Sequence, residues 1–347
     1  MSPDKITPPA KKRNLILIYV ESLEATYTNQ QVFGQNLLKS LDKITSGWHT
    51  FNYQSAPGAT WTMGGIVASQ CGVPLQEPQY KSKRNLGHVD NIGTQESSFM
   101  PGILCLGDVL QSAGYINAFL GGARLQFASK EKFLRSHGYS VLWGKAQWDN
   151  LALNTANGWG LLDDELFSQA KKILTRLVKE NQPFNLTLLT VNTHSPHGFV
   201  DQFCSQKGAH NFTHIVTCTG EEVANFLSFI KKNNFDKNTD IVVIGDHLAM
   251  INPLIYQLTN QSKRFIYNKF YSSQPLVRNR ETINPFSIYP TILYMLGFRF
   301  KDNRLALGVS AFGFLNPQFE QLNPSFLGIN QNKYKQYYAQ FWKKSSA

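Results

Sequence analysis

The sequence predicts an α/β fold in which helices cover a mostly parallel β-sheet. Short apolar runs of strand length alternate with longer segments whose apolar residues recur at helical spacing, an order typical of α/β proteins. Three of the apolar runs are followed directly by polar residues suited to metal or phosphate chemistry. Because ligands of open α/β sheets bind at the carboxyl ends of strands, this distribution favours the same fold class.

Four apolar runs are expected to form strands of the sheet. Each run is short, contains β-branched or large apolar residues, and leads into a polar or glycine-containing turn. The runs are residues 15–20 (LILIYV), 114–120 (GYINAFL), 184–191 (FNLTLLTV) and 240–244 (DIVVI).

Three segments are expected to be helices. Residues 163–181 begin with three acidic residues, which favour a helix N-terminus, and continue with apolar residues at helical spacing. Residues 221–233 repeat the apolar pattern. Residues 287–296 are expected to form a short apolar helix that ends at Gly297.

The chain is interpreted as one domain. Residues 1–13 are polar and rich in proline, as expected of a linker or chain end, and residues 14–342 are expected to form a single catalytic domain. No apolar stretch approaches the roughly 18–20 residues of a membrane-spanning helix, and no signal peptide is evident. The segment that directs this domain to its compartment is therefore expected to lie outside this chain.

The composition is that of a folded, basic protein. Of 347 residues, 42% are hydrophobic and 16% are charged, which excludes a disordered chain. The net charge of +11 fits either a nucleic acid or an anionic membrane surface as partner. No nucleic-acid-binding module accompanies the charge, so an anionic lipid surface is the better interpretation and no nucleic acid partner is expected.

The polar residues after the strands indicate a metal site. Glu21 follows the first run, His194 follows the third, and Asp246 and His247 follow the fourth. Carboxylates and imidazoles are ligands that divalent cations prefer. Taken singly, each residue has an ordinary alternative, such as a surface carboxylate or an aspartate that caps a helix. Their shared position at strand ends favours one metal-binding group.

A nucleophile is expected in residues 55–74. This segment has a turn at Pro57-Gly58, two threonines at positions 60 and 62, and then a run of small residues that could begin a helix. A hydroxyl group at a helix N-terminus lies beside free backbone N–H groups and the positive end of the helix dipole, which suits phosphate binding. The alternative is a threonine that only caps the helix.

The four cysteines allow two interpretations. None of Cys71, Cys105, Cys204 and Cys218 lies at zinc-finger spacing. They are either buried thiols of a cytosolic enzyme or two disulfides in an oxidising compartment. The even number, divided into two local pairs, favours the second interpretation and predicts Cys71–Cys105 and Cys204–Cys218.

Several motifs together resemble the bacterial phosphoglycerol transferase I family. This family belongs to the lipoteichoic acid synthase-like group of the sulfatase and alkaline phosphatase superfamily. The resemblance covers residues 14–297 in order. The motifs are YVESLE (19–24), PGATWTMGGIVASQCGVPL (57–75), CLGD (105–108), GWG with a following DD (158–164), THSP (193–196) and GDHLAM (245–250).

The resemblance implies a three-layer αβα sandwich and gives roles to specific residues. Glu21, Asp246 and His247 match the metal ligands. Thr62 matches the threonine that both binds the metal and attacks phosphorus, so Thr60 becomes a neighbouring substrate-side residue. The implied cofactor is one divalent metal, with Mn²⁺ preferred and Mg²⁺ or Zn²⁺ as alternatives.

Two further residues match substrate-binding positions. His194 corresponds to a histidine that hydrogen bonds the phosphoglycerol or carries its proton. Lys130 falls where lipoteichoic acid synthase has an arginine, and a lysine lacks the arginine's two-pronged geometry. The sulfatase motif Cys-x-Pro-x-Arg is not kept, because Cys71 is followed by Gly-Val-Pro-Leu, so sulfatase activity is not expected.

The resemblance implies a transferase at the membrane surface. Phosphoglycerol would move from phosphatidylglycerol to a phosphothreonine and then to a periplasmic glucan or another hydroxyl acceptor, with phosphodiesterase activity when water is the acceptor. The chain would be a soluble ectodomain at the periplasmic face of the bacterial inner membrane, without its N-terminal anchor. The alternatives are a phosphoethanolamine transferase, a lipoteichoic-acid-type synthase, or an inactive lipid- or glucan-binding module.

Overall fold

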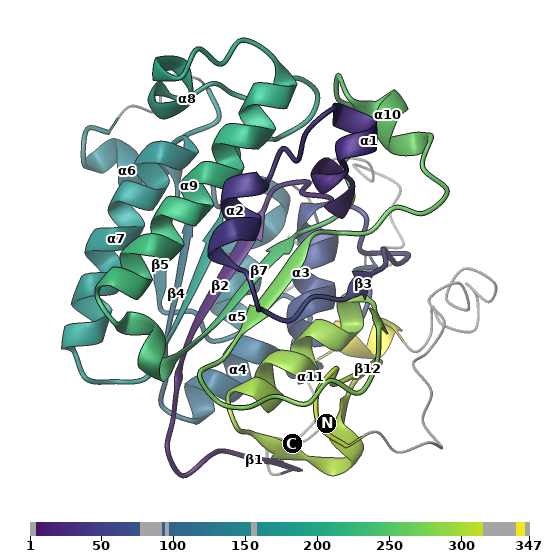
Figure 1. Ribbon diagram of the computed structural model, residues 1–347. Helices are drawn as coiled ribbons and strands as arrows, with labels where there is room; N and C mark the ends of the chain where they lie inside the picture. The colour runs from purple at the N-terminus through teal and green to yellow at the C-terminus, as the bar shows by residue number, and fades with distance from the viewer. Residues whose placement is uncertain (1–4, 77–91, 94–96, 154–157, 315–337, 344–347) are drawn as a thin grey trace.

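The computed structural model describes residues 5–76, 92–93, 97–153, 158–314 and 338–343 (Figure 1). The main sheet is six-stranded, in the order β5-β4-β6-β2-β7-β8. All neighbouring strands are parallel except β8, which pairs antiparallel with β7 at one edge. The predicted α/β fold with a mostly parallel sheet is therefore confirmed.

All four predicted strands are present in this sheet, and two short ones join them. The strands are β2 (Asn14–Val20), β4 (Ile116–Gly121), β5 (Val141–Trp143), β6 (Phe184–Leu189), β7 (Thr239–Gly245) and β8 (Asn268–Tyr271). Three two-stranded sheets also form: β1 (Ile6–Thr7) with β10 (Arg299–Phe300), β3 (Asn52–Tyr53) with β9 (Thr282–Ile283), and β11 (Arg304–Leu305) with β12 (Gly308–Val309).

Helices cover both faces of the main sheet, so the molecule has three layers. Alternate side chains of β2 contact different hydrophobic clusters: Leu17 and Tyr19 lie in one, Ile16 and Ile18 in the other. The first cluster is covered by α3 (Thr62–Cys71), α4 (Leu106–Ser112), α5 (Lys130–Ser136) and α11 (Pro285–Met295). The second is covered by α2 (Lys39–Ile44), α7 (Asp163–Lys179) and α9 (Phe212–Lys232).

Short helices occupy the connections, and one predicted helix is longer than expected. The short ones are α1 (Gln30–Phe33), α6 (Lys145–Asn150), α8 (Gln202–Gln206) and α10 (Ile255–Thr259). Helix α9 begins at Phe212 rather than at residue 221, because the Asn211 side chain accepts a hydrogen bond from the His214 backbone N–H and caps it. Threonine, cysteine and glycine in this first part weakened the apolar pattern.

The N-terminal segment packs against the domain. Within the residues expected to be a linker, β1 pairs with β10. The buried Arg13 guanidinium lies 2.8 Å from an Asp240 carboxylate oxygen at the start of β7. Over the described ranges, no helix combines the length and apolar character needed to cross a bilayer.

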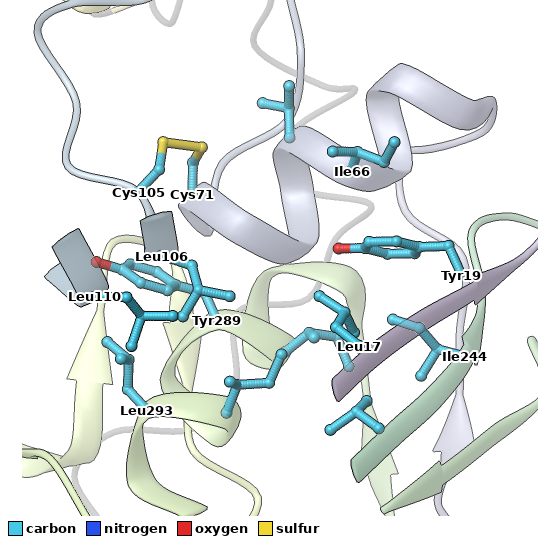
Figure 2. Close-up of a cluster of buried hydrophobic side chains, with 14 of the residues drawn as sticks. Leu17, Tyr19, Ile66, Cys71, Cys105, Leu106, Leu110, Ile244, Tyr289 and Leu293 are labelled. Atoms are coloured by element: carbon cyan, nitrogen blue, oxygen red, sulfur yellow. A yellow bond between two sulfur atoms is a disulfide. The ribbon is translucent and has the colours of Figure 1, made fainter. Parts of the chain in front are cut away.

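One of the two predicted disulfides is present. Cys71 at the end of α3 is bonded to Cys105 directly before α4, with a Cα separation of 4.2 Å (Figure 2). The second prediction is wrong: Cys204 and Cys218 are buried free thiols. The two thiols lie close enough for each to affect the pKa of the other, but no covalent bond joins them.

Candidate active site

The ends of two adjacent strands bring three acidic and imidazole side chains together. In the parallel pairing of β2 and β7, Val20 lies opposite Gly245, so the next residues, Glu21 and Asp246, emerge side by side. The ligand atoms of Glu21, Asp246 and His247 all lie within 4.8 Å of one another. His247 Nε2 is 3.4 Å from Glu21 Oε1 and 3.5 Å from Asp246 Oδ2.

The hydrogen bonds around this group orient its free atoms toward a common point. Asp246 Oδ1 accepts hydrogen bonds from the Ser22 and His247 backbone N–H groups at 2.8 and 3.0 Å. His247 Nδ1 donates to the Leu248 carbonyl oxygen at 2.8 Å, since a carbonyl can only accept. Asp246 Oδ2 and His247 Nε2 are buried and make no hydrogen bond to the described residues. Two orphaned ligand atoms beside a third carboxylate fit a divalent cation.

The electrostatics of the group also fit a cation. Burial tends to raise the pKa of Glu21, but the close approach and charge of His247 lower it to about 2. Burial and the charge of Glu21 raise the pKa of Asp246 to about 7. Burial acts to lower the pKa of His247, but the two carboxylates raise it to about 10. A proton on His247 therefore balances the carboxylates, and a bound cation would take its place.

Thr62 lies beside this group at the N-terminus of α3. It is the first residue of the helix, and its hydroxyl group donates a hydrogen bond to Glu21 Oε2 at 3.3 Å. Helix α3 approaches closely because residue 65 is glycine: a Cβ there would lie 2.0 Å from the Asp246 carbonyl oxygen. Thr60 is exposed and precedes the helix. The structure therefore brings Thr62, and not Thr60, to the acidic group.

Lys130 and His194 flank the group. Lys130, the first residue of α5, is buried; burial lowers its pKa to about 8, although the charges of Glu21 and Asp246 oppose this. His194 is half-buried, and its ring centroid lies 4.2 Å from that of Trp159. Its Nδ1 lies 2.7 Å from the Ser195 carbonyl oxygen, and its charge contributes to the low pKa of Glu21.

Several supporting residues were missed by the sequence reasoning. Thr190 Oγ1 accepts from the Glu21 backbone N–H at 3.0 Å, and Thr193 Oγ1 donates to the Glu21 carbonyl oxygen at 2.5 Å. Glu24 is fully buried, accepts from the Ala249 backbone N–H at 2.9 Å and pairs with Arg264. These contacts fix the loops that carry the ligands. The YVESLE motif contains Glu24, but nothing in the motif indicates that Arg264, 240 positions later, is its partner.

Comparison with known proteins agrees with this geometry. Residues 13–298 match the family model described as Sulfatase. The chain is 36% identical over 318 residues to proteins named phosphoglycerol transferase I from Escherichia coli O6:K15:H31 (strain 536 / UPEC) and from Escherichia fergusonii. Each alignment covers 88% of this chain but only 40% of the relative, so this chain spans less than half of those proteins.

Solved structures show the same fold. The lipoteichoic acid synthase LtaP from Listeria monocytogenes aligns with a TM-score of 0.63 at 17% identity, covering 86% of this chain and 75% of that one. The zinc complex of the C-terminal periplasmic domain of EcEptC from Escherichia coli aligns with a TM-score of 0.61 at 12% identity, covering 92% and 91%. Because the Sulfatase family model matches residues 13–298, which is most of the chain, this chain belongs to the sulfatase family.

Proposed function

We propose that this chain is a metal-dependent phosphoglycerol transferase that uses Thr62 as its nucleophile. The observation that carries the proposal is the Thr62 hydroxyl group at the N-terminus of α3, hydrogen bonded to Glu21 of the buried acidic group. The relatives named phosphoglycerol transferase I support phosphoglycerol as the transferred group. The geometry of Thr62 alone would suit the transfer of another phosphoester equally well. The chain spans less than half of those relatives, so donor and acceptor both belong to the proposal.

Glu21, Thr62, Asp246 and His247 would hold one divalent cation, for which Mn²⁺ is preferred. Such a cation lowers the pKa of a coordinated hydroxyl group and stabilises negative charge on phosphoryl oxygens. The sulfur of Cys71 is occupied by its disulfide with Cys105, which supports threonine rather than a modified cysteine as the nucleophile.

The chain's own residues would carry out a two-step displacement. Thr62 would lose its hydroxyl proton to solvent, Thr62 Oγ1 would attack phosphorus, and the bond from phosphorus to the diacylglycerol oxygen would break. The Thr62 oxygen would regain a proton from solvent when the second step releases it. Lys130 and the N-terminus of α3 bind the phosphoryl oxygens. His194 protonates the departing diacylglycerol oxygen and later accepts the proton of the acceptor hydroxyl group. Phosphoglycerol then leaves Thr62 for a glucan, another hydroxyl group, or water.

Exposed apolar residues near the site support a lipid donor. Val200 follows His194 in the loop after β6, and Met250 and Ile251 follow His247 in the loop after β7. The Ser195 hydroxyl group donates to the Ile251 carbonyl oxygen at 2.5 Å, so the two loops lie together. Exposed apolar residues at a catalytic edge favour contact with a membrane surface. We place the reaction at the periplasmic face of the inner membrane.

Intact-mass analysis tests this proposal directly. The protein is incubated with Mn²⁺ and either phosphatidylglycerol or phosphatidylethanolamine. A phosphoglycerol adduct from the first lipid, and no adduct from the second, is the expected result. A phosphoethanolamine adduct would establish the neighbouring transferase activity instead. No adduct from either lipid, with the metal bound, would favour an inactive lipid- or glucan-binding module.

A further inference from the structure

A second group of buried acidic side chains lies beside the loop that follows β6. Asp163 begins α7, Asp201 precedes α8, and Glu222 lies within α9. All three side chains are buried. In the described part of the chain, no lysine, arginine or histidine forms an ion pair with any of them.

Two of these carboxylates have clear structural partners. Asp163 accepts hydrogen bonds from the Val191 and Asn192 backbone N–H groups at 2.7 and 3.1 Å. Asp201 accepts from the Asn192 side-chain amide at 2.6 Å and from the Cys204 backbone N–H at 2.8 Å. Both carboxylates therefore hold the segment that leads to His194.

Glu222 has no such partner. Only 4% of its surface is exposed, and neither carboxylate oxygen makes a hydrogen bond to any described residue. Burial, together with the charges of Asp163 and Asp201, raises its pKa to about 12. An unpartnered buried carboxylate is costly, so either a proton or a bound cation must neutralise it.

The neighbours of Glu222 are ligand atoms for a cation. One ligand atom from each of Asp201, Cys204 and Glu222 lies within 4.8 Å of the other two. Cys204 is a fully buried free thiol, and the buried free thiol of Cys218 lies close enough to affect the pKa of Cys204. The available donors are thus two carboxylates and a pair of thiols.

We propose that Asp201, Cys204 and Glu222 bind a zinc-type divalent cation, with Cys218 as the fourth ligand. Zinc accepts mixed thiolate and carboxylate ligands in four-coordinate sites, whereas magnesium and calcium select oxygen ligands alone. Binding converts the two thiols to thiolates, and their protons pass to solvent together with any proton on Glu222. Four protein ligands leave no open position, so the site is structural and would fix the segment that carries His194.

Cobalt substitution distinguishes this site from the proposed catalytic one. A Co²⁺ ion bound by thiolate has an intense sulfur-to-metal charge-transfer absorption. Glu21, Thr62, Asp246 and His247 contain no sulfur, and Cys71 and Cys105 are joined in a disulfide. In the full chain, the absorption can therefore come only from the Cys204 site.

The expected result is charge-transfer absorption that saturates at one Co²⁺ per chain and is reversed by Zn²⁺. Cys204→Ser should abolish the absorption, and Glu222→Gln should weaken Co²⁺ binding at least tenfold. Asp246→Asn should leave the charge-transfer absorption unchanged, and this expectation does not depend on the proposed function. Folding of each variant is checked by circular dichroism. Folded wild-type protein that binds no Co²⁺ through thiolate, or an intact Cys204–Cys218 disulfide in the untreated protein, would overturn the proposal.

Discussion

Thr60 and Thr62 are chemically alike but lie in different surroundings. Thr62 contacts Glu21 and begins α3, whereas Thr60 is exposed in the preceding turn. Thr62→Ala is therefore expected to abolish the phosphoglycerol adduct and lower turnover by about 10³-fold or more. Intact-mass analysis and the release of diacylglycerol measure these two effects.

Thr60→Ala is the matched control for this prediction. It removes the same hydroxyl group two residues away and should reduce turnover only modestly. Metal content should persist in both variants, because Glu21, Asp246 and His247 remain. Loss of the adduct in the Thr60 variant, with its retention in the Thr62 variant, would move the nucleophile to position 60.

Lys130 is expected to make the proposed reaction depend on pH. Its ammonium group is charged below a pKa of about 8, a value lowered by burial. As pH rises through about 8, the charge is lost, and kcat/KM for the anionic donor should fall. Lys130→Arg keeps the charge and should remove this alkaline decrease in kcat/KM. Lys130→Met lacks the charge and should show a low kcat/KM at every pH. If the decrease persists in Lys130→Met, another group titrates.

At the scale of elements, the approach of α3 to β7 positions Thr62, the proposed nucleophile. A Cβ at Gly65 would lie 2.0 Å from the backbone oxygen of Asp246, so Gly65→Ala must displace the helix. We expect a loss of about 1–3 kcal/mol in the free energy of unfolding and at least a tenfold loss of turnover, although every ligand remains. Thermal melting and diacylglycerol release measure these effects.

Gly220 in α9 provides a control in another helix. A Cβ there would lie 3.0 Å from the end of the Leu38 side chain, and the next atoms, Leu38 Cα at 3.7 Å and the Leu37 carbonyl oxygen at 3.9 Å, are at ordinary contact distance. Gly220→Ala should leave both stability and turnover close to those of the wild type, since alanine also favours helix. Equal effects of the two substitutions would mean that the close approach of α3 is not what positions Thr62.

The strands, and the grouping of Glu21, Asp246 and His247, could be predicted because both follow from simple sequence patterns. Buried parallel strands are continuous apolar runs, and the polar residues that follow them meet at one edge of the sheet. The three-residue strand β5 and the edge strand β8 were missed, since neither has an apolar run of sufficient length.

The supporting contacts could not be predicted from local sequence. Thr190 and Glu21 meet only because β2 pairs with β6 in one register, and Glu24 meets Arg264 across 240 positions. Likewise, the spacing of Cys204 and Cys218 predicted their proximity but not their reduced state. The two carboxylates of that group come from different places, Asp201 before α8 and Glu222 within α9, and no motif indicated them.

At the scale of the whole molecule, the distribution of exposed apolar side chains predicts which edge of the sheet would face a membrane. Seven large apolar side chains are exposed in the described ranges, and Val200, Met250, Ile251 and Tyr256 follow strands β6 and β7. The net charge of +11 adds attraction to anionic lipid. From both features we expect the carboxyl edge of the sheet, and not its opposite edge, to face the bilayer in the proposed reaction.

Substitution at this edge should separate membrane contact from chemistry. Ile251 is 74% exposed, and its insertion into lipid would contribute about 1.5–3 kcal/mol. Ile251→Asp should weaken binding to phosphatidylglycerol vesicles about tenfold or more in a sedimentation assay. Turnover of a short-chain, water-soluble donor should be retained, because Ser195 contacts only the Ile251 backbone. Val277, 73% exposed and remote from these loops in sequence, gives the control Val277→Asp, which should bind vesicles normally. Equal vesicle binding by both variants would contradict this orientation.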